Sequence, residues 1–140
     1  MPRLPAVRDY MDTDVKTLRA EMDILDAIDF LIQHHVTGAP VVNDEMGVVG
    51  ILTEKDCLRL LALGSGGDVA SGTVGDYMTR DVLLIEPRTN IYYAAGLFLN
   101  RSFRRIPVVE GGKLVGAITR FDLVRAVSEN HKLVRDGSGV

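Results

Sequence analysis

Two short motifs in the chain pair a threonine with an aspartate three residues later: Thr53-x-x-Asp56 and Thr119-x-x-Asp122. A threonine just before a helix, with an acidic residue three positions on, is typical of a capping box, which satisfies free backbone N–H groups. The same helix start also carries the positive end of the helix dipole, which attracts phosphate. The motifs therefore predict a structural cap, a phosphate site, or both.

Basic residues distinguish the surroundings of the two motifs. Arg101, Arg104 and Arg105 precede Pro107, whereas Gly38 stands shortly before Pro40 at the corresponding place. A guanidinium offers a planar fork of donors to phosphate oxygens, and such a charge-assisted hydrogen bond contributes about 1.5–3 kcal/mol. We therefore expect a phosphorylated ligand near Thr119 and Asp122. Near Thr53 and Asp56 we expect a weaker site, a less charged ligand or none.

The arginines are also compatible with two roles that involve no phosphorylated small molecule. Cations at a helix end suit its dipole, so the group can be a solvated basic surface. Phe103 lies among the arginines, and a base could stack on it as in RNA-binding proteins. The formal net charge of −3, from 16 basic and 19 acidic residues, argues against nucleic acid as a partner.

The remaining residues provide no catalytic constellation. The chain has a single cysteine, Cys57, so it offers neither an internal disulfide nor a cysteine-based metal set, and we expect this side chain to pack in a helix. We find no Walker-type loop and no nucleophile elbow. We therefore predict no enzyme activity, no required cofactor and no metal site. The N-terminal residues lack the apolar core of a secretory signal, and we expect a cytoplasmic protein with no membrane segment.

The elements that position these motifs occur twice. Asp9-Tyr10-Met11 returns as Asp76-Tyr77-Met78, and Pro40-Val41-Val42 returns as Pro107-Val108-Val109 at the same offset. The Thr-x-x-Asp motifs then follow at an offset one residue shorter, which places the lost residue in a turn. We predict a first repeat at residues 7–63, a Gly- and Ser-rich linker at 64–73, a second repeat at 74–127 and a polar tail at 128–140.

Each repeat has the pattern strand, helix, strand, strand, helix. In the second, Val82–Ile85 reads as a buried strand closed by a proline, and Thr89 or Asn90 can cap the helix that follows. In the first, apolar residues at helical spacing follow Asp23, and the apolar runs 39–42 and 48–52 form a hairpin. This order predicts an α/β (α+β) fold.

With these motifs in place, residues 7 to 127 resemble a pair of cystathionine β-synthase (CBS) domains, a Bateman module. The resemblance rests on the two Asp-x-Met starts, the two Pro-Val-Val strands and the two Gly-x-x-Thr-x-x-Asp ends. It implies two β-α-β-β-α repeats packed with pseudo-twofold symmetry, and two clefts that in many members bind adenine nucleotides or S-adenosyl compounds. It also implies a regulatory module, here expected to be free-standing, that reports ligand binding to another protein.

The resemblance assigns ligand-binding residues to the two clefts, with the aspartates accepting hydrogen bonds from ribose hydroxyls. The main cleft would use Lys16, Arg104, Arg105, Ile106, Pro107, Thr119 and Asp122. The second, weaker cleft would use Thr37, Gly38, Ala39, Thr53, Asp56 and Leu83. The expected ligand is AMP, ADP or ATP, with S-adenosylmethionine as a further candidate.

A second hypothesis is a ligand-free module for dimerisation or protein interaction. The helices that contain Cys57–Leu63 and Leu123–Val127 carry more apolar residues than a solvated helix needs, which favours a homodimer. The regulated protein target is not identified by the sequence.

Overall fold

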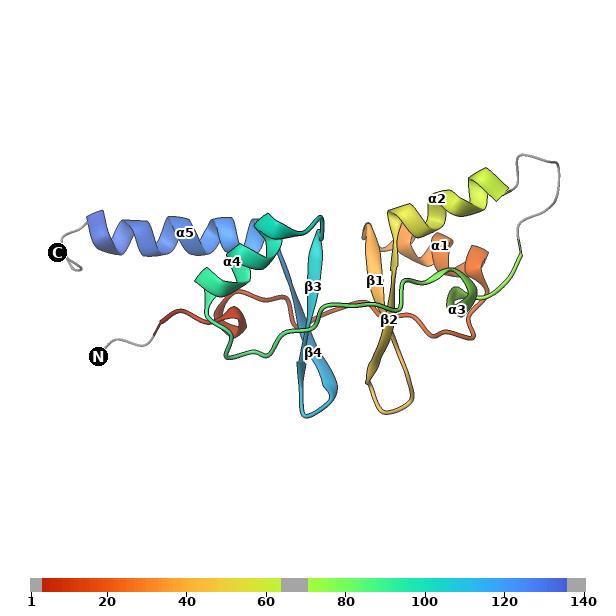
Figure 1. Ribbon diagram of the computed structural model, residues 1–140, viewed down its shortest axis with the longest axis horizontal. Coiled ribbons are helices and arrows are strands. Elements are labelled where there is room, and N and C mark those ends of the chain that lie inside the picture. Colours follow the sequence, from red (N-terminus) through yellow and green to blue (C-terminus); the bar gives the residue numbers. More distant parts are fainter. Residues whose placement is uncertain (1–3, 64–70, 136–140) are drawn as a thin grey trace. The chain divides into compact units, whose positions relative to one another are not determined.

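The computed structural model describes residues 4–63 and 71–135, and within them two compact units are present. The α2 unit holds the described residues of 15–82 together with 112–114. The α5 unit holds 4–14, 83–111 and 115–135. Each unit is built around one antiparallel hairpin (Figure 1).

The α2 unit consists of a hairpin and three helices. Its elements are α1 (Ile24–Gln33), β1 (Gly38–Val42), β2 (Val48–Thr53), α2 (Glu54–Leu63) and α3 (Val74–Tyr77). The α1 helix begins after Asp23, whose carboxylate accepts from the backbone N–H groups of Leu25 and Asp26. The strands pair with Gly38 opposite Thr53. The core is formed by Leu18, Ile24, Ala27, Leu31, Ala39, Val41, Leu52, Leu60, Val74 and Met78.

The α5 unit repeats this plan with a longer final helix. Its elements are the 3-10 helix η1 (Val7–Asp9), α4 (Ile91–Asn100), β3 (Arg105–Glu110), β4 (Lys113–Thr119) and α5 (Arg120–Arg135). Asn90 caps α4 by accepting from the backbone N–H of Tyr93, as predicted for one of two candidate residues. The core is formed by Val7, Ile85, Ile91, Ala94, Phe98, Ile106, Val108, Ile118, Leu123 and Ala126.

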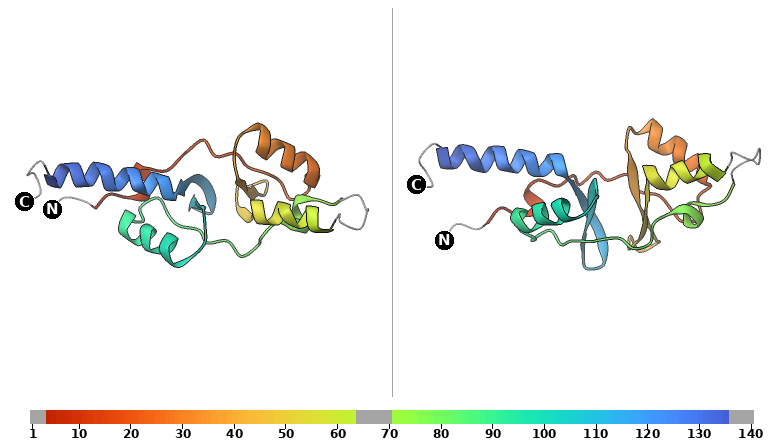
Figure 2. Two further views of the ribbon diagram at one scale, coloured as in Figure 1. Left: turned by 90° about the horizontal axis from the view of Figure 1, so that it is seen from above. Right: turned by 45° about the horizontal axis from the view of Figure 1, so that its top comes forward.

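The segment that opens each sequence repeat packs in the unit formed mainly by the other repeat. Asp12 exchanges two backbone hydrogen bonds of 2.9 Å with Ala117 on β4, and Thr79 makes the same pair of 2.9 Å bonds with Ile51 on β2. Figure 2 shows the first of these segments, in red, running close to α5. The Arg125 guanidinium on α5 donates to the carbonyl of Tyr10 at 3.0 Å, which fixes the segment there.

The α+β class, the helix after Asp23 and both predicted hairpin strands are confirmed. The prediction of a strand at Val82–Ile85 is wrong, because Ile85 makes only an isolated parallel bridge to Val108. Ile85 donates to the Pro107 carbonyl and accepts from the Val109 N–H. To extend this parallel pairing toward Leu83, residue 107 would have to donate a backbone N–H, and to extend it beyond Ile85, residue 87 would have to donate one. Both residues are prolines, which have no backbone N–H. Prolines on both sides therefore limit the pairing to a single residue.

The last helix extends further than its apolar pattern indicated. The α5 helix runs to Arg135, so residues 128–135 of the segment predicted as a polar tail are helical. Residues 136–140, and residues 64–70 of the predicted linker, lie outside the described part of the chain.

Candidate functional site

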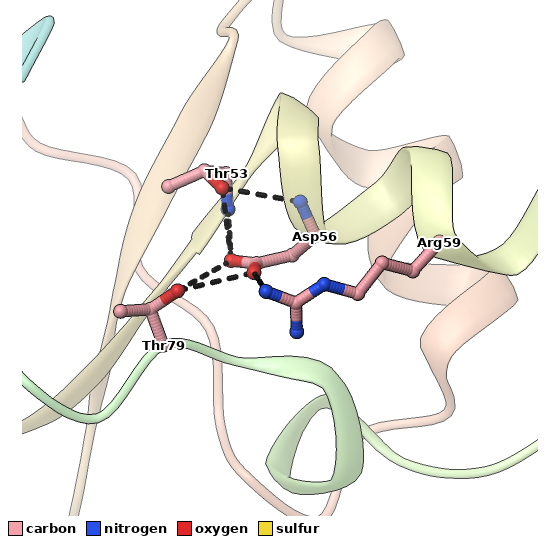
Figure 3. Close-up of polar contacts among 4 residues, drawn as sticks. All are labelled: Thr53, Asp56, Arg59 and Thr79. Carbon is pink, nitrogen blue, oxygen red and sulfur yellow. Dashed lines mark hydrogen bonds and ion pairs between the residues drawn. The ribbon is translucent and has the colours of Figure 1, made fainter. Parts of the chain in front are cut away.

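Asp56 lies in the first turn of α2 with only 1% of its surface exposed, and its carboxylate is surrounded by donors (Figure 3). Its Oδ2 accepts from the Thr53 backbone N–H at 3.0 Å and from the Thr53 hydroxyl at 2.9 Å. The Thr79 hydroxyl lies 3.0 Å from Oδ1 and 3.2 Å from Oδ2. The Arg59 guanidinium lies 3.6 Å from Oδ1. Asp56 is thus both the acidic partner of Thr53 in the predicted capping box and the centre of a polar cluster.

Asp122 occupies the equivalent place at the start of α5 but is more accessible. Its Oδ2 accepts from the Thr119 backbone N–H at 2.8 Å, and its own N–H donates to the Thr119 hydroxyl at 3.1 Å. Oδ1 forms an ion pair of 3.0 Å with Arg125, and 15% of the side chain is exposed. The same guanidinium reaches the carbonyl of Tyr10, so Asp122 is linked to the N-terminal segment.

The residue facing each carboxylate distinguishes the two sites. Thr79 and Asp12 hold the same backbone position, each exchanging a pair of hydrogen bonds with its strand. The Thr79 hydroxyl points at Asp56, whereas the Asp12 carboxylate is exposed and accepts from the backbone N–H of Asp14 at 2.9 Å. A carboxylate cannot donate a hydrogen bond when ionised, so Asp12 cannot serve Asp122 as Thr79 serves Asp56.

Sequence reasoning missed Thr79, although a signal for it was present. It directly follows the second Asp-Tyr-Met motif, where the first motif is followed by Asp12. Comparison of the two repeats at this position identifies a difference in donor capacity.

Gly38 and Arg105, at the starts of β1 and β3, differ because of backbone packing as well as charge. A Cβ added to Gly38 would lie 2.7 Å from the Leu52 carbonyl oxygen, so glycine is required by this close approach. Arg105 is half-buried and Arg104 is exposed. The α5 unit therefore has two guanidinium groups where the α2 unit has Thr37 and Gly38.

The structure brings most of the predicted residues of each cleft together within one unit. Of the main set, Arg104, Arg105, Ile106, Pro107, Thr119 and Asp122 belong to the α5 unit. Of the second set, Thr37, Gly38, Ala39, Thr53 and Asp56 belong to the α2 unit. Lys16 lies in the α2 unit and Leu83 in the α5 unit, so each belongs to the unit opposite its predicted set, and their roles stay predictions.

The apolar members of the predicted sets are core residues, except Leu83, which is half-buried against the core of the α5 unit. Ile106 and Ala39 are fully buried, and Pro107 is also among the buried side chains. Their side chains pack inside the units, so a ligand would meet their backbone. This leaves the threonines, the aspartates and the arginines as the side chains able to recognise a polar ligand.

Two titratable groups near these sites have raised pKa values. Burial raises the pKa of the Tyr10 hydroxyl, and a hydrogen bond with Glu129 adds to this effect. Burial also raises the pKa of the Cys57 thiol, with smaller contributions from Asp56 and Glu54. A thiol of this kind is a poor nucleophile because the reactive thiolate is disfavoured.

Within residues 4–63 and 71–130, no three His, Cys, Asp or Glu side chains gather in a way that would hold a metal ion. In the same residues, no helix has the length and apolar character needed to cross a membrane.

Comparison with known proteins finds one family twice along the chain. A family model described as CBS domain matches residues 7–63 and 74–129. An uncharacterized protein of Methanocaldococcus jannaschii, MJ1225, is 37% identical over 125 residues, which are 89% of this chain and 43% of that protein. CBSX1 of Arabidopsis thaliana, a chloroplastic CBS domain-containing protein, is 30% identical over 81% of this chain and 59% of its own length. The chain thus spans about half the length of these relatives.

Solved structures of the same kind are similar over nearly the whole chain. The crystal structure of CBSX2 in complex with AMP has a TM-score of 0.79 and 34% identity, covering 91% of this chain and 98% of that one. The CBS domain pair of MJ0100, in complex with 5′-methylthioadenosine and S-adenosyl-L-methionine, has a TM-score of 0.75 and 25% identity, covering 86% and 98%.

Proposed function

Because the chain belongs to the CBS domain family, with copies at residues 7–63 and 74–129, we propose that it is a regulatory module that binds an adenine nucleotide and thereby alters a partner protein. The similar CBSX2 structure contains AMP, and the MJ0100 pair contains S-adenosyl compounds. Adenosine is common to these ligands. We therefore place AMP, ADP and ATP first, with S-adenosylmethionine as a further candidate.

The observation that carries the proposal is the partly exposed carboxylate of Asp122, in the unit that also holds Arg104 and Arg105. Within the described residues, this carboxylate accepts hydrogen bonds from the Thr119 N–H and from Arg125. An ionised carboxylate has about four acceptor positions, so ribose hydroxyls can donate to the remaining ones. Arg104, Arg105 and the first turn of α5 would then receive the phosphate.

Regulation requires that the ligand favour one arrangement of the protein over another. Arg125 supplies a physical link, because it bonds both the proposed ribose-binding carboxylate and the Tyr10 carbonyl of the N-terminal segment. A ribose hydroxyl that bonds Asp122 would redistribute the charge that holds Arg125. Ligand binding would thereby change how firmly residues 4–14 are held.

A thermal-shift and calorimetric titration with AMP, ADP, ATP and S-adenosylmethionine tests the binding. Arg105→Ala should raise the dissociation constant about ten- to a hundredfold, as expected for one charge-assisted bond. Arg88→Ala is the charge-matched control, since Arg88 is exposed and pairs with Glu86 in the same unit. A wild-type protein that binds none of the four compounds would overturn the proposal.

Small-angle scattering with and without the tightest ligand tests the regulatory part. A regulatory ligand should change the scattering curve, because it must shift the population of arrangements. If the ligand binds but the scattering curve and the amide hydrogen exchange of residues 4–14 stay unchanged, the ligand does not alter the arrangement of the protein, and the regulatory part of the proposal is overturned.

A second candidate function, a ligand-free interaction module, is favoured by apolar side chains on two helices. Leu58 and Leu61 on α2 are 63% and 77% exposed, and Val124 and Val127 on α5 are 58% and 66% exposed. These pairs hold equivalent positions in the two repeats, and such faces suit a homodimer. Leu61→Glu with Val127→Glu should convert a dimer to a monomer in light scattering. A dimer that is lost while the adenylates have no effect would favour this candidate.

A further inference from the structure

The two Thr-x-x-Asp sites use the same backbone frame but differ in what remains available to a ligand. In both, the aspartate accepts from the threonine N–H three residues earlier, at 3.0 Å for Asp56 and 2.8 Å for Asp122. In both, an arginine one turn along the helix faces the carboxylate. The difference between the two sites therefore lies outside the capping box, in the segment that bonds to the strand just before it: the segment of Thr79 at the Asp56 site and that of Asp12 at the Asp122 site.

At the Asp56 site, that segment provides a donor to the carboxylate. The Thr79 hydroxyl is within hydrogen-bond distance of both oxygens, and the Thr53 hydroxyl and N–H take further positions on Oδ2. With the Arg59 guanidinium 3.6 Å from Oδ1, three internal donors and an ion pair already face the Asp56 carboxylate. The 1% exposure of Asp56 agrees with this count.

At the Asp122 site, the same backbone position provides no donor. Asp12 is bonded to β4 as Thr79 is to β2, but its side chain is exposed and turned to the Asp14 N–H. Asp122 itself keeps 15% of its side chain accessible.

We propose that Thr79 closes the Asp56 site to ribose, so that the chain takes one adenine nucleotide, at Asp122. This inference rests on the proposed function. It adds the number of nucleotides bound per chain and the residue, Thr79, that determines this number. A ribose at Asp56 would have to displace the Thr79 hydroxyl, which has one proton to donate and lies within hydrogen-bond distance of both carboxylate oxygens. At Asp122 the two ribose hydroxyls replace only solvent.

Isothermal titration calorimetry of AMP into the full chain tests this with five proteins. The wild type should bind one AMP per chain, and Asp122→Asn, which keeps the cap acceptor but removes the charge, should bind none. Thr79→Ala should bind a second AMP, since it frees the acceptor positions of Asp56, and bind it more weakly than the first, since the α2 unit has Thr37 and Gly38 in place of Arg104 and Arg105. The double variant Asp122→Asn with Thr79→Ala should bind one. Thr79→Ser is the matched control, because it retains the hydroxyl and should keep a single site.

The outcomes separate this inference from the function on which it rests. A wild type that binds neither AMP nor ADP, ATP or S-adenosylmethionine overturns both, whereas one that binds another of these compounds is titrated with that compound in place of AMP. Two AMP per chain in the wild type supports the function and overturns the inference. One AMP that is retained in Asp122→Asn, or a Thr79→Ala protein that still binds only one, also leaves the function standing and overturns the role of Thr79.

A reciprocal substitution tests the same point at the other site. Asp12→Thr places a hydroxyl where Thr79 has one and should weaken AMP binding at Asp122 at least tenfold. Asp12→Val has the same shape without the donor and should bind as the wild type does. Equal dissociation constants for the Thr and Val variants would overturn the proposal. Circular dichroism of both proteins checks that they are folded.

Discussion

Replacing Thr79 by valine measures how strongly the buried carboxylate of Asp56 depends on its neighbour. Valine has nearly the shape of threonine, so no cavity term enters. The substitution removes a hydroxyl that lies 3.0 Å and 3.2 Å from the two oxygens of a carboxylate with 1% exposure. A hydrogen bond to a charged group contributes about 1.5–3 kcal/mol. We expect the free energy of unfolding to fall by this amount.

The expected change is large enough to measure by urea unfolding and by heat. For a chain of this length, each kcal/mol lowers the melting temperature by about 3 °C, which gives a shift of roughly 5–9 °C. Asp12→Val is the matched control, since Asp12 holds the equivalent backbone position but is exposed. It should lower the unfolding free energy by less than about 0.5 kcal/mol.

Far-UV circular dichroism during urea titration provides both free energies, with equal m-values as a check on the comparison. A Thr79→Val protein within about 0.5 kcal/mol of the wild type would refute the reasoning, because the hydroxyl would then contribute no more than an exposed bond. Equal losses in both variants would refute it as well, since the asymmetry between the sites would have no energetic basis.

Three further substitutions or reactions test other parts of the structure. Gly116→Ala should lower the unfolding free energy by about 1–3 kcal/mol, because its Cβ would lie 2.8 Å from the Asp12 carbonyl oxygen; Gly96→Ala, whose Cβ meets nothing within 4 Å, should raise it in the same urea assay. Asp23→Ala should lower the melting temperature by the equivalent of about 1 kcal/mol through loss of the α1 cap. Cys57 should react with iodoacetamide at pH 8 more slowly than a free cysteine peptide, because burial raises the pKa of its thiol and lowers the thiolate fraction; an equal rate by mass spectrometry would contradict this.

Local structure could be predicted well from the sequence because its causes are local. The α1 helix follows from an apolar face and an aspartate cap, and the hairpins follow from β-branched runs around a polar turn. The Thr-x-x-Asp caps likewise depend on residues three positions apart. The wrong strand at 82–85 has a non-local cause, since the missing N–H belongs to Pro107 on another strand.

The packing of the repeat starts could not be predicted from periodicity. A duplicated sequence offers each opening segment two equivalent partners, and the pattern of residues 7–14 is the same whichever hairpin they join. The structure places Asp12 against β4 and Thr79 against β2. The two capping boxes were predicted because the threonine and the aspartate stand three positions apart, and the ligand-binding roles of Arg104 and Arg105 stay predictions. Thr79 was missed because it belongs to the second repeat, whereas Asp56 belongs to the first, and only the packing of the opening segment brings them together.

Because each opening segment packs in the unit formed mainly by the other repeat, the surroundings of Asp56 and Asp122 can differ while both units keep the same fold. Asp56 and Asp122 must each cap a helix, so neither can change without loss of stability. The residues opposite them, Thr79 and Asp12, bond to the strands through the backbone, so a change of their side chains leaves those backbone bonds in place. A hydroxyl at position 79 turns one carboxylate into an internal acceptor, and a carboxylate at position 12 leaves the other accessible. The two carboxylates therefore differ in accessibility through one side chain, which each unit receives from the opposite repeat.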